Sequence, residues 1–139
     1  MNKQEIFERV FHHLWNQNKQ SSIKEGDSEL GSCMYRTDDG RMCAAGCLIT
    51  DDNYNPDIER TTVSAPRVLR ALVNSGVPRD LISFVGDLQQ IHDSWEEYHP
   101  VSFRKHIVTE FMTIGLASGS DLDTDFIVEA VGNENSNVY

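Results

Sequence analysis

Apolar residues recur at three- and four-residue steps in five separate segments of this 139-residue chain. This spacing is typical of amphipathic α-helices, because residues three and four positions apart lie on the same face of a helix. The predicted helices cover residues 2–20, 64–76, 79–97, 102–117 and 123–131. We therefore expect a mainly helical fold in which the apolar faces of about five helices surround one core.

A small β-hairpin is predicted between the first two helices, near residues 33–46. An Asp-Asp-Gly turn at residues 38–40 would join its arms, because glycine accepts a positive φ without steric cost. The second arm is ambiguous, since MCAAGCLI is equally compatible with a helix that carries Cys43 and Cys47 on one face. The polar segment 21–32 contains two glycines and is predicted to be a loop. The expected fold class is α+β, mainly α.

The length and composition fit a single globular domain. A chain of 139 residues is large enough to bury one core without disulfides or metal. Hydrophobic residues make up 39% of the chain and charged residues 24%, which are ordinary values for a globular protein. We expect residues 1–132 to form the domain and the polar residues 133–139 to form a frayed tail.

The chain lacks the apolar stretches that direct proteins to membranes or to export. No apolar run approaches the roughly 18 residues of a membrane span, and MNKQEIFERV at the N-terminus lacks the apolar centre of a signal peptide. A cytoplasmic location without a membrane partner is expected, where the cysteines stay reduced. The net charge of −10 repels phosphate backbones, so direct nucleic-acid binding is not expected.

All three cysteines lie between positions 33 and 47, in the pattern C-x9-C-x3-C. Zinc sites usually contain two closely spaced ligand pairs, so this pattern favours no cofactor and a core role for Cys43 and Cys47 among small apolar neighbours. The alternative is a zinc site made of Cys33, Cys43, Cys47 and His92. A cysteine nucleophile would need Cys47 with His92 and Asp93, but no local signature supports it. Catalysis is therefore left open, with a non-enzymatic role favoured.

The arginines are concentrated in one part of the chain. Between positions 60 and 79 there are four arginines and no acid. Together with the two arginines of the hairpin they could converge on a phosphate-bearing ligand through bidentate contacts. The alternative is a solvated surface on which they pair with the surplus of Asp and Glu. The candidate binding residues are Tyr35, Arg36, Arg41, Asp51, Asp52, Arg60, Arg67 and Arg70.

Two parts of the sequence carry a resemblance to a known family. The order Cys33-Met34-Tyr35-Arg36, then GRMCAAGCLI at residues 40–49, then Asp51-Asp52, resembles a small family of uncharacterised proteins of tailed phages and prophages. The later LQQIHD at residues 88–93 is similar to the downstream element of that family. The resemblance implies a phage accessory protein in the host cytoplasm and implies no particular activity. Small phage accessory proteins commonly bind a host protein or sequester a signalling molecule.

These observations favour a non-enzymatic accessory protein that binds and modulates a host protein, for example a defence or gene-expression factor. An acidic surface would speed docking to a basic, nucleic-acid-handling partner. Sequestration of a small phosphate-bearing signal molecule is one alternative, and a small Cys/His zinc protein or enzyme is another. Homo-oligomerisation stays open, because amphipathic helices serve a core and an interface equally well.

Overall fold

Five α-helices are present in residues 1–24, 31–98 and 100–136, the part of the chain that the computed structural model describes. They are α1 (Lys3–Gln17), α2 (Pro66–Asn74), α3 (Ile82–Asp93), α4 (Phe103–Gly115) and α5 (Asp125–Ser136). Each lies on one of the five segments predicted from periodicity. The predicted helix 79–97 is shorter than expected, because a 3-10 turn, η4 (Arg79–Leu81), precedes α3 and the helix ends at Asp93.

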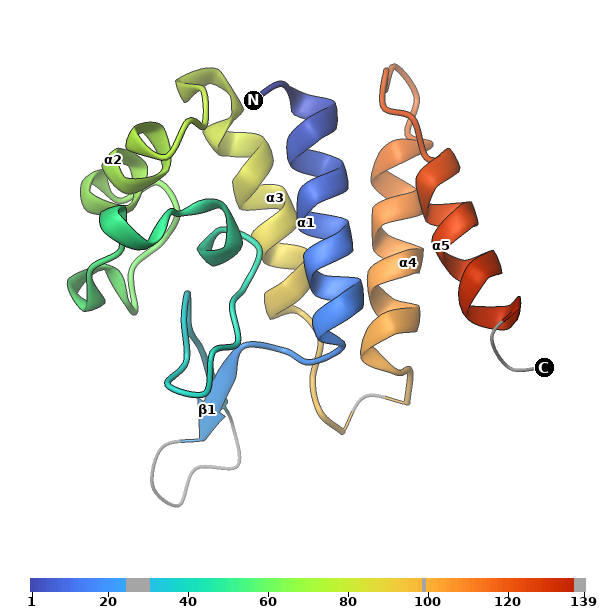
Figure 1. Cartoon of the computed structure of the whole chain (residues 1–139), viewed down its shortest axis with the longest axis horizontal. Helices are drawn as coiled ribbons and strands as arrows, with labels where there is room; N and C mark the ends of the chain where they lie inside the picture. Colours follow the sequence, from blue (N-terminus) through green and yellow to red (C-terminus); the bar gives the residue numbers. More distant parts are fainter. Residues whose placement is uncertain (25–30, 99, 137–139) are drawn as a thin grey trace.

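The core forms around α1, which contacts both α3 and α4, while α3 also contacts α4. Five apolar side chains of α1 have no exposed surface, and full burial of each such side chain stabilises the fold by roughly 1.5–3 kcal/mol. They are Ile6, Phe7, Val10, Phe11 and Leu14. α5 lies on the outer side of α4 (Figure 1) and contributes Phe126, whose ring is 5.6 Å from that of Phe7.

The polar segment that follows α1 pairs as a small antiparallel sheet. β1 (Ser22–Lys24) pairs with β2 (Gly31–Cys33), so that Ser22 lies opposite Cys33. The loop predicted for 21–32 therefore contains β1 and the start of β2, while residues 25–30 lie outside the described residues. The fold class, α+β and mainly α with a small hairpin, is confirmed.

The Asp-Gly turn forms as predicted, but the arms on its two sides barely pair. Gly40 has a φ of 89°, and the N–H of Thr37 donates to the carbonyl of Arg41 at 2.9 Å. Within the described residues the arms share one bridge, between Arg36 and Met42. The second arm then becomes the 3-10 turn η1 (Gly46–Leu48) rather than a continued strand. The ambiguous segment is thus helical at its end.

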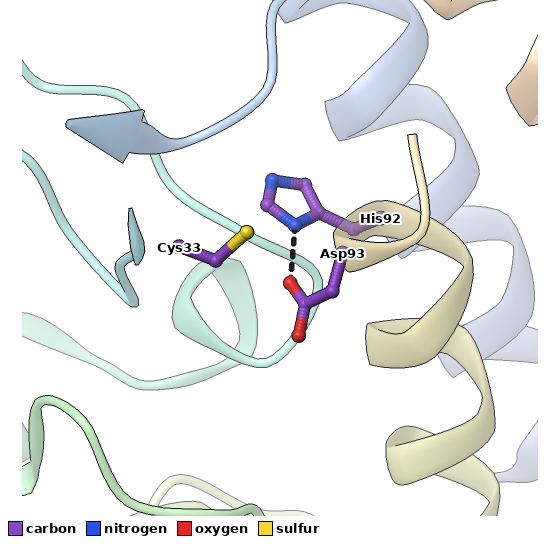
Figure 2. A group of neighbouring side chains, drawn as sticks. All are labelled: Cys33, His92 and Asp93. Carbon is purple, nitrogen blue, oxygen red and sulfur yellow. Dashed lines mark hydrogen bonds and ion pairs between the residues drawn. The ribbon is translucent and has the colours of Figure 1, made fainter. Parts of the chain in front are cut away.

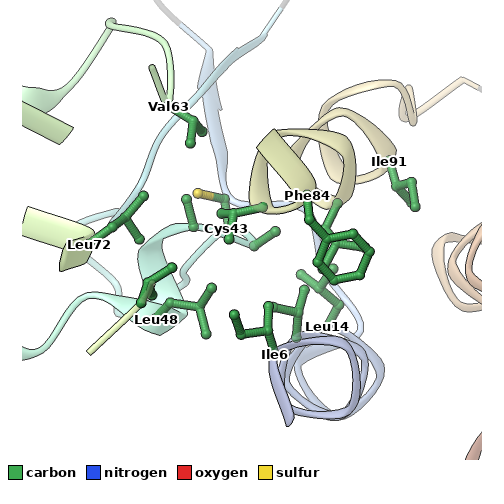
Figure 3. Close-up of a cluster of buried hydrophobic side chains, with 14 of the residues drawn as sticks. Ile6, Leu14, Cys43, Leu48, Val63, Leu72, Phe84 and Ile91 are labelled. Atoms are coloured by element: carbon green, nitrogen blue, oxygen red, sulfur yellow. The ribbon is translucent and has the colours of Figure 1, made fainter. Parts of the chain in front are cut away.

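The chain from η1 to α2 packs beside α3 and α1 (Figure 1) through two further 3-10 turns, η2 (Asp51–Asn53) and η3 (Pro56–Ile58). η1 approaches the segment that follows β2 so closely that a Cβ atom at Gly46 would lie 2.0 Å from the carbonyl oxygen of Tyr35. Figure 3 shows Leu48 and Leu72 of this part, together with Cys43 just before η1, meeting Ile6 of α1 and Phe84 of α3 in one apolar cluster. The site described below is therefore attached to the helical core by buried contacts.

Two further predictions concern the C-terminal tail and the presence of membrane-spanning segments. α5 continues to Ser136, so the predicted tail starts inside a helix, and residues 137–139 lie outside the described residues. Among the helices in the described ranges, none is both long enough and apolar enough to cross a membrane.

Candidate functional site

A cleft of about 710 Å³ lies beside α3. It is lined by two loop segments, 33–35 and 60–64, and by the face of α3 that carries Gly86, Asp87 and Asp93. Its volume is that of a site for a small molecule or for a few side chains of a partner. Of the eight predicted binding residues, Tyr35 and Arg60 line this cleft.

Cys33, His92 and Asp93 meet at one end of the cleft (Figure 2). One ligand-type atom from each residue lies within 4.8 Å of the other two. Cys33 is the last residue of β2, and the other two are the last residues of α3, so packing of the small sheet on the C-terminal end of α3 assembles the group. Two of the four predicted zinc ligands, Cys33 and His92, are thus brought together.

The other two predicted zinc ligands lie elsewhere. Cys43 has no exposed surface and belongs to the apolar core (Figure 3), where its sulfur accepts the N–H of Gly46 at 3.3 Å. Cys47 is partly buried against the same core, and its thiol donates to the carbonyl of Ala44 at 3.1 Å. The core role is confirmed for Cys43, whereas Cys47 is partly buried and packs against the core.

His92 is held in one tautomer by the backbone. Its side chain is fully buried, and the backbone N–H of Ser21 donates to its Nε2 at 2.8 Å. A backbone amide can only donate, so Nε2 accepts and the proton of the neutral ring is on Nδ1. Nδ1 lies 2.8 Å from Oδ1 of Asp93, to which it donates. Both ring nitrogens are therefore engaged.

Asp93 is the acceptor at the centre of this network. Besides His92, the side-chain amide of Gln89 donates to Oδ1 of Asp93 at 2.8 Å, while the oxygen of that amide accepts the N–H of Ala45. The thiol of Cys33 lies near this carboxylate, with the sulfur and a carboxylate oxygen within 4.8 Å of each other. Burial of Cys33 and the neighbouring carboxylate of Asp93 raise the pKa of the thiol to about 12. Cys33 is therefore a neutral thiol near pH 7.

These contacts do not form a nucleophile with its general base. Cysteine nucleophiles are activated by a base within hydrogen-bond reach and by a lowered thiol pKa, whereas the thiol of Cys33 lies near the carboxylate of Asp93 and has a raised pKa. Ligation of a metal through Nδ1 of His92 would move the ring proton to Nε2, where it would face the N–H of Ser21. That buried N–H would then lose its acceptor, at a cost of about 1–3 kcal/mol.

The predicted arginines do not converge on one ligand position. Nη1 of Arg36 lies 2.7 Å from Oδ1 of Asp51, and its guanidinium lies over the ring of Tyr54 at 4.7 Å. Nε of Arg41 bonds to the carboxylate of Asp39, and its Nη1 donates to the carbonyl of Gln20. Both guanidinium groups are thus used inside the protein.

The remaining predicted residues lie on the outer surface. Arg67 is 3.7 Å from Asp57, with both side chains well exposed, and such a pair contributes little to stability. Arg70 is exposed on α2. Asp52 accepts a hydrogen bond from the hydroxyl of Thr50.

Glu59 is an important residue that the sequence patterns missed. Its two carboxylate oxygens accept the backbone N–H groups of Tyr35 and Arg36 at 2.8 and 3.1 Å, and the hydroxyl of Tyr54 at 2.6 Å. It therefore fixes the segment that follows β2 and lines the cleft to the segment that follows η3. The available signal was indirect: backbone donors in a partly buried loop need acceptors, and Glu59 lies in a polar stretch near them.

Two residues of the cleft are conformationally unfavourable. Gly86 lies in the interior of α3, where glycine is less stable than alanine by roughly 0.5–1 kcal/mol. A Cβ atom at this position would have no described atom within 4 Å, so packing within the described residues does not require glycine. Arg60, which also lines the cleft, has a φ of 67°, in the left-handed region that non-glycine residues adopt at a cost.

The fold and this site define a mainly helical α+β protein with a cleft of mixed apolar and polar lining, beside which a histidine is held by hydrogen bonds. Comparison with models of known protein families, with curated proteins and with solved structures finds no match to this chain.

Proposed function

We propose that this chain is a non-enzymatic binding protein whose cleft receives a basic segment of another protein. The observation that carries the proposal is Gly86. The fold tolerates a side chain there, yet α3 has a less stable glycine that leaves its backbone open to the cleft. Residues that break a local stability rule without a structural reason are expected at functional sites. A partner chain that lies close against α3 would explain the glycine.

The charge of the cleft favours a basic partner. Asp87 and Asp93 contribute two carboxylates, against one guanidinium from Arg60. The chain as a whole carries a net charge of −10, which would attract a basic protein at long range and speed its docking. A phosphate-bearing ligand is supported less well, because Arg36 and Arg41 are engaged in contacts within the protein.

The chemistry of the cleft supports binding rather than catalysis. The thiol of Cys33 is protonated near neutral pH, and neither nitrogen of His92 is available to take a proton from a substrate while its hydrogen bonds persist. General base catalysis needs an available acceptor within hydrogen-bond reach of the substrate. The resemblance of residues 33–52 to phage accessory proteins supports a cytoplasmic host protein as the partner, such as a defence or gene-expression factor that handles nucleic acid.

The proposal can be tested by affinity capture from a bacterial lysate with three forms of the chain. Gly86→Leu places a side chain in the cleft, and Gly132→Leu adds the same side chain to the exposed surface of α5, where a Cβ atom likewise has no described atom within 4 Å. We expect a basic protein to be recovered with the wild-type chain and with Gly132→Leu, and at least tenfold less with Gly86→Leu. Equal recovery with all three forms, or no specific recovery with any, would contradict the proposal.

A further inference from the structure

We infer that the cleft binds an arginine side chain of the partner, with its guanidinium against the carboxylate of Asp93. This inference rests on the proposed function and specifies the group that enters the cleft.

The carboxylate of Asp93 is fixed in one orientation before any ligand arrives. Gln89 and His92 each donate to Oδ1 at 2.8 Å. Figure 2 shows the second carboxylate oxygen pointing away from His92. The side chain is 42% exposed, so a group in the cleft can reach it. Pairing with a fixed carboxylate costs less conformational entropy than pairing with a mobile one.

The two groups that donate to Asp93 are both neutral. Gln89 donates through an amide, and His92 is a neutral imidazole because its Nε2 accepts from Ser21. Neutral donors orient the carboxylate and leave its negative charge uncompensated. A structural carboxylate is more commonly paired with a cation when it is partly buried. The groups that orient Asp93 therefore include no permanent cation, and a ligand cation can pair with its carboxylate.

The surroundings favour arginine over a smaller cation. A guanidinium presents its donors in a planar fork that matches a carboxylate, and it loses less hydration on partial burial than an ammonium group. Gly86 leaves room for the stem of the side chain against α3, and the hydroxyl groups of Thr61 and Thr62 lie on the loop segment of the same cleft. Asp87 adds a second negative charge on α3.

The test is a titration of the isotopically labelled full chain with Nα-acetyl-arginine methylamide. Binding is monitored by the changes in the backbone amide chemical shifts. The matched ligand is the citrulline analogue, which has the same shape and no charge, and the lysine analogue supplies an ammonium group. We expect saturable shifts for Cys33 and for residues 86–93 with the arginine analogue, weaker binding of the lysine analogue, and at least tenfold weaker binding of the citrulline analogue. Equal binding of the citrulline analogue would overturn the inference, as would tighter binding of the lysine analogue or no shifts in the cleft.

Two variants complete the test. Asp93→Asn keeps an acceptor oxygen for Gln89 and His92 and removes the charge, so we expect it to retain the fold and to bind the arginine analogue at least tenfold more weakly. Asp57→Asn removes an exposed charge outside the cleft and should bind as the wild type does. Unchanged binding by Asp93→Asn would overturn the inference.

The two proposals fail in distinguishable ways. If the arginine analogue does not bind while Gly86→Leu still abolishes capture of the partner, the inference is wrong and the proposed function stands. If the analogue binds at Asp93 while Gly86→Leu leaves capture unchanged, the proposed function is wrong.

Discussion

The backbone N–H of Ser21 donates a hydrogen bond of 2.8 Å to Nε2 of the buried His92. This contact joins the segment after α1 to the C-terminal end of α3, across 71 positions of the sequence. Because the donor is a backbone amide, the contact also decides which nitrogen of the imidazole carries the proton. Because the proton is on Nδ1, His92 donates to Oδ1 of Asp93. The orientation of this carboxylate, which lines the cleft, therefore depends on the tautomer of His92.

The first prediction concerns the tautomer of His92. Long-range proton–nitrogen correlation spectra of the folded chain near pH 7 should show a neutral imidazole protonated on Nδ1. The reason is that Nε2 accepts from Ser21 while Nδ1 donates to Asp93. A ring protonated on Nε2 would contradict the hydrogen-bond network. Repeating the measurement with one equivalent of zinc tests the alternative metal site, since ligation through Nδ1 would move the proton to Nε2.

The second prediction concerns the stability that His92 provides. His92→Ala should lower the free energy of unfolding by about 2–4 kcal/mol, because it leaves a cavity and deprives the buried N–H of Ser21 of its acceptor. His12→Ala, at an exposed position of α1, is the matched control and should change stability by less than about 0.5 kcal/mol. Urea denaturation measures both values. Similar losses for the two variants would show that His92 is not a structural anchor.

The third prediction concerns Glu59. Glu59→Gln has one acceptor oxygen where the wild type has two, so it cannot satisfy Tyr35, Arg36 and Tyr54 in the same geometry. We expect a loss of about 1–3 kcal/mol in the free energy of unfolding. Asp57→Asn, an exposed acid near the same turn, should cost less than about 0.5 kcal/mol. A neutral effect of Glu59→Gln in thermal or urea denaturation would contradict the role assigned to this residue.

The fourth prediction concerns Gly46. Gly46→Ala would place a Cβ atom 2.0 Å from the carbonyl oxygen of Tyr35, so the backbone must move. Overpacking of this kind costs about 1–3 kcal/mol or more. Gly132→Ala, in α5 with open space around the added atom, should instead be neutral or stabilising. In urea denaturation, Gly46→Ala should have a lower unfolding midpoint than Gly132→Ala. Equal midpoints would contradict the close packing of η1 against Tyr35.

The fifth prediction concerns stability at alkaline pH. The pKa of Cys33 rises from 9.0 to about 12 on folding, because burial and the neighbouring Asp93 disfavour the thiolate. The folded chain therefore keeps a proton that the unfolded chain releases at alkaline pH. The contribution of this thiol to the free energy of unfolding is complete below pH 9 and is lost as the pH rises through about 12. In urea denaturation under reducing conditions, the free energy of unfolding of Cys33→Ser should fall less steeply with rising alkaline pH than that of the wild type. Identical slopes would mean that folding does not raise this pKa.

Much of the helical fold can be predicted because helix patterns are local. The apolar stripe of α1 consists of the residues that periodicity selects, from Ile6 to Leu14, and all of them are fully buried. The Asp-Gly turn at Gly40 also forms as expected, since its positive φ depends on one residue type. The core role of Cys43 follows from its small apolar neighbours. In each case the determining residues lie within a few positions of each other.

The cleft was not predictable in the same way, because it depends on which distant groups satisfy each polar atom. Cys33 and Asp93 are brought together by the pairing of β2 with β1 and by the packing of both against the end of α3. Arg36 and Arg41 look like ligand-binding residues in the sequence, and their partners are instead supplied by Asp51, Asp39 and backbone carbonyls.

The sequence by itself therefore determined the helices, their buried faces and the acidic charge of the chain, since these depend on local spacing and on composition. Tertiary structure alone decided the tautomer of His92, the inert state of the Cys33 thiol and the fixed orientation of the Asp93 carboxylate. The physical reason is that a hydrogen bond depends on a few tenths of an ångström between groups far apart in the chain. Only the packed fold defines those distances.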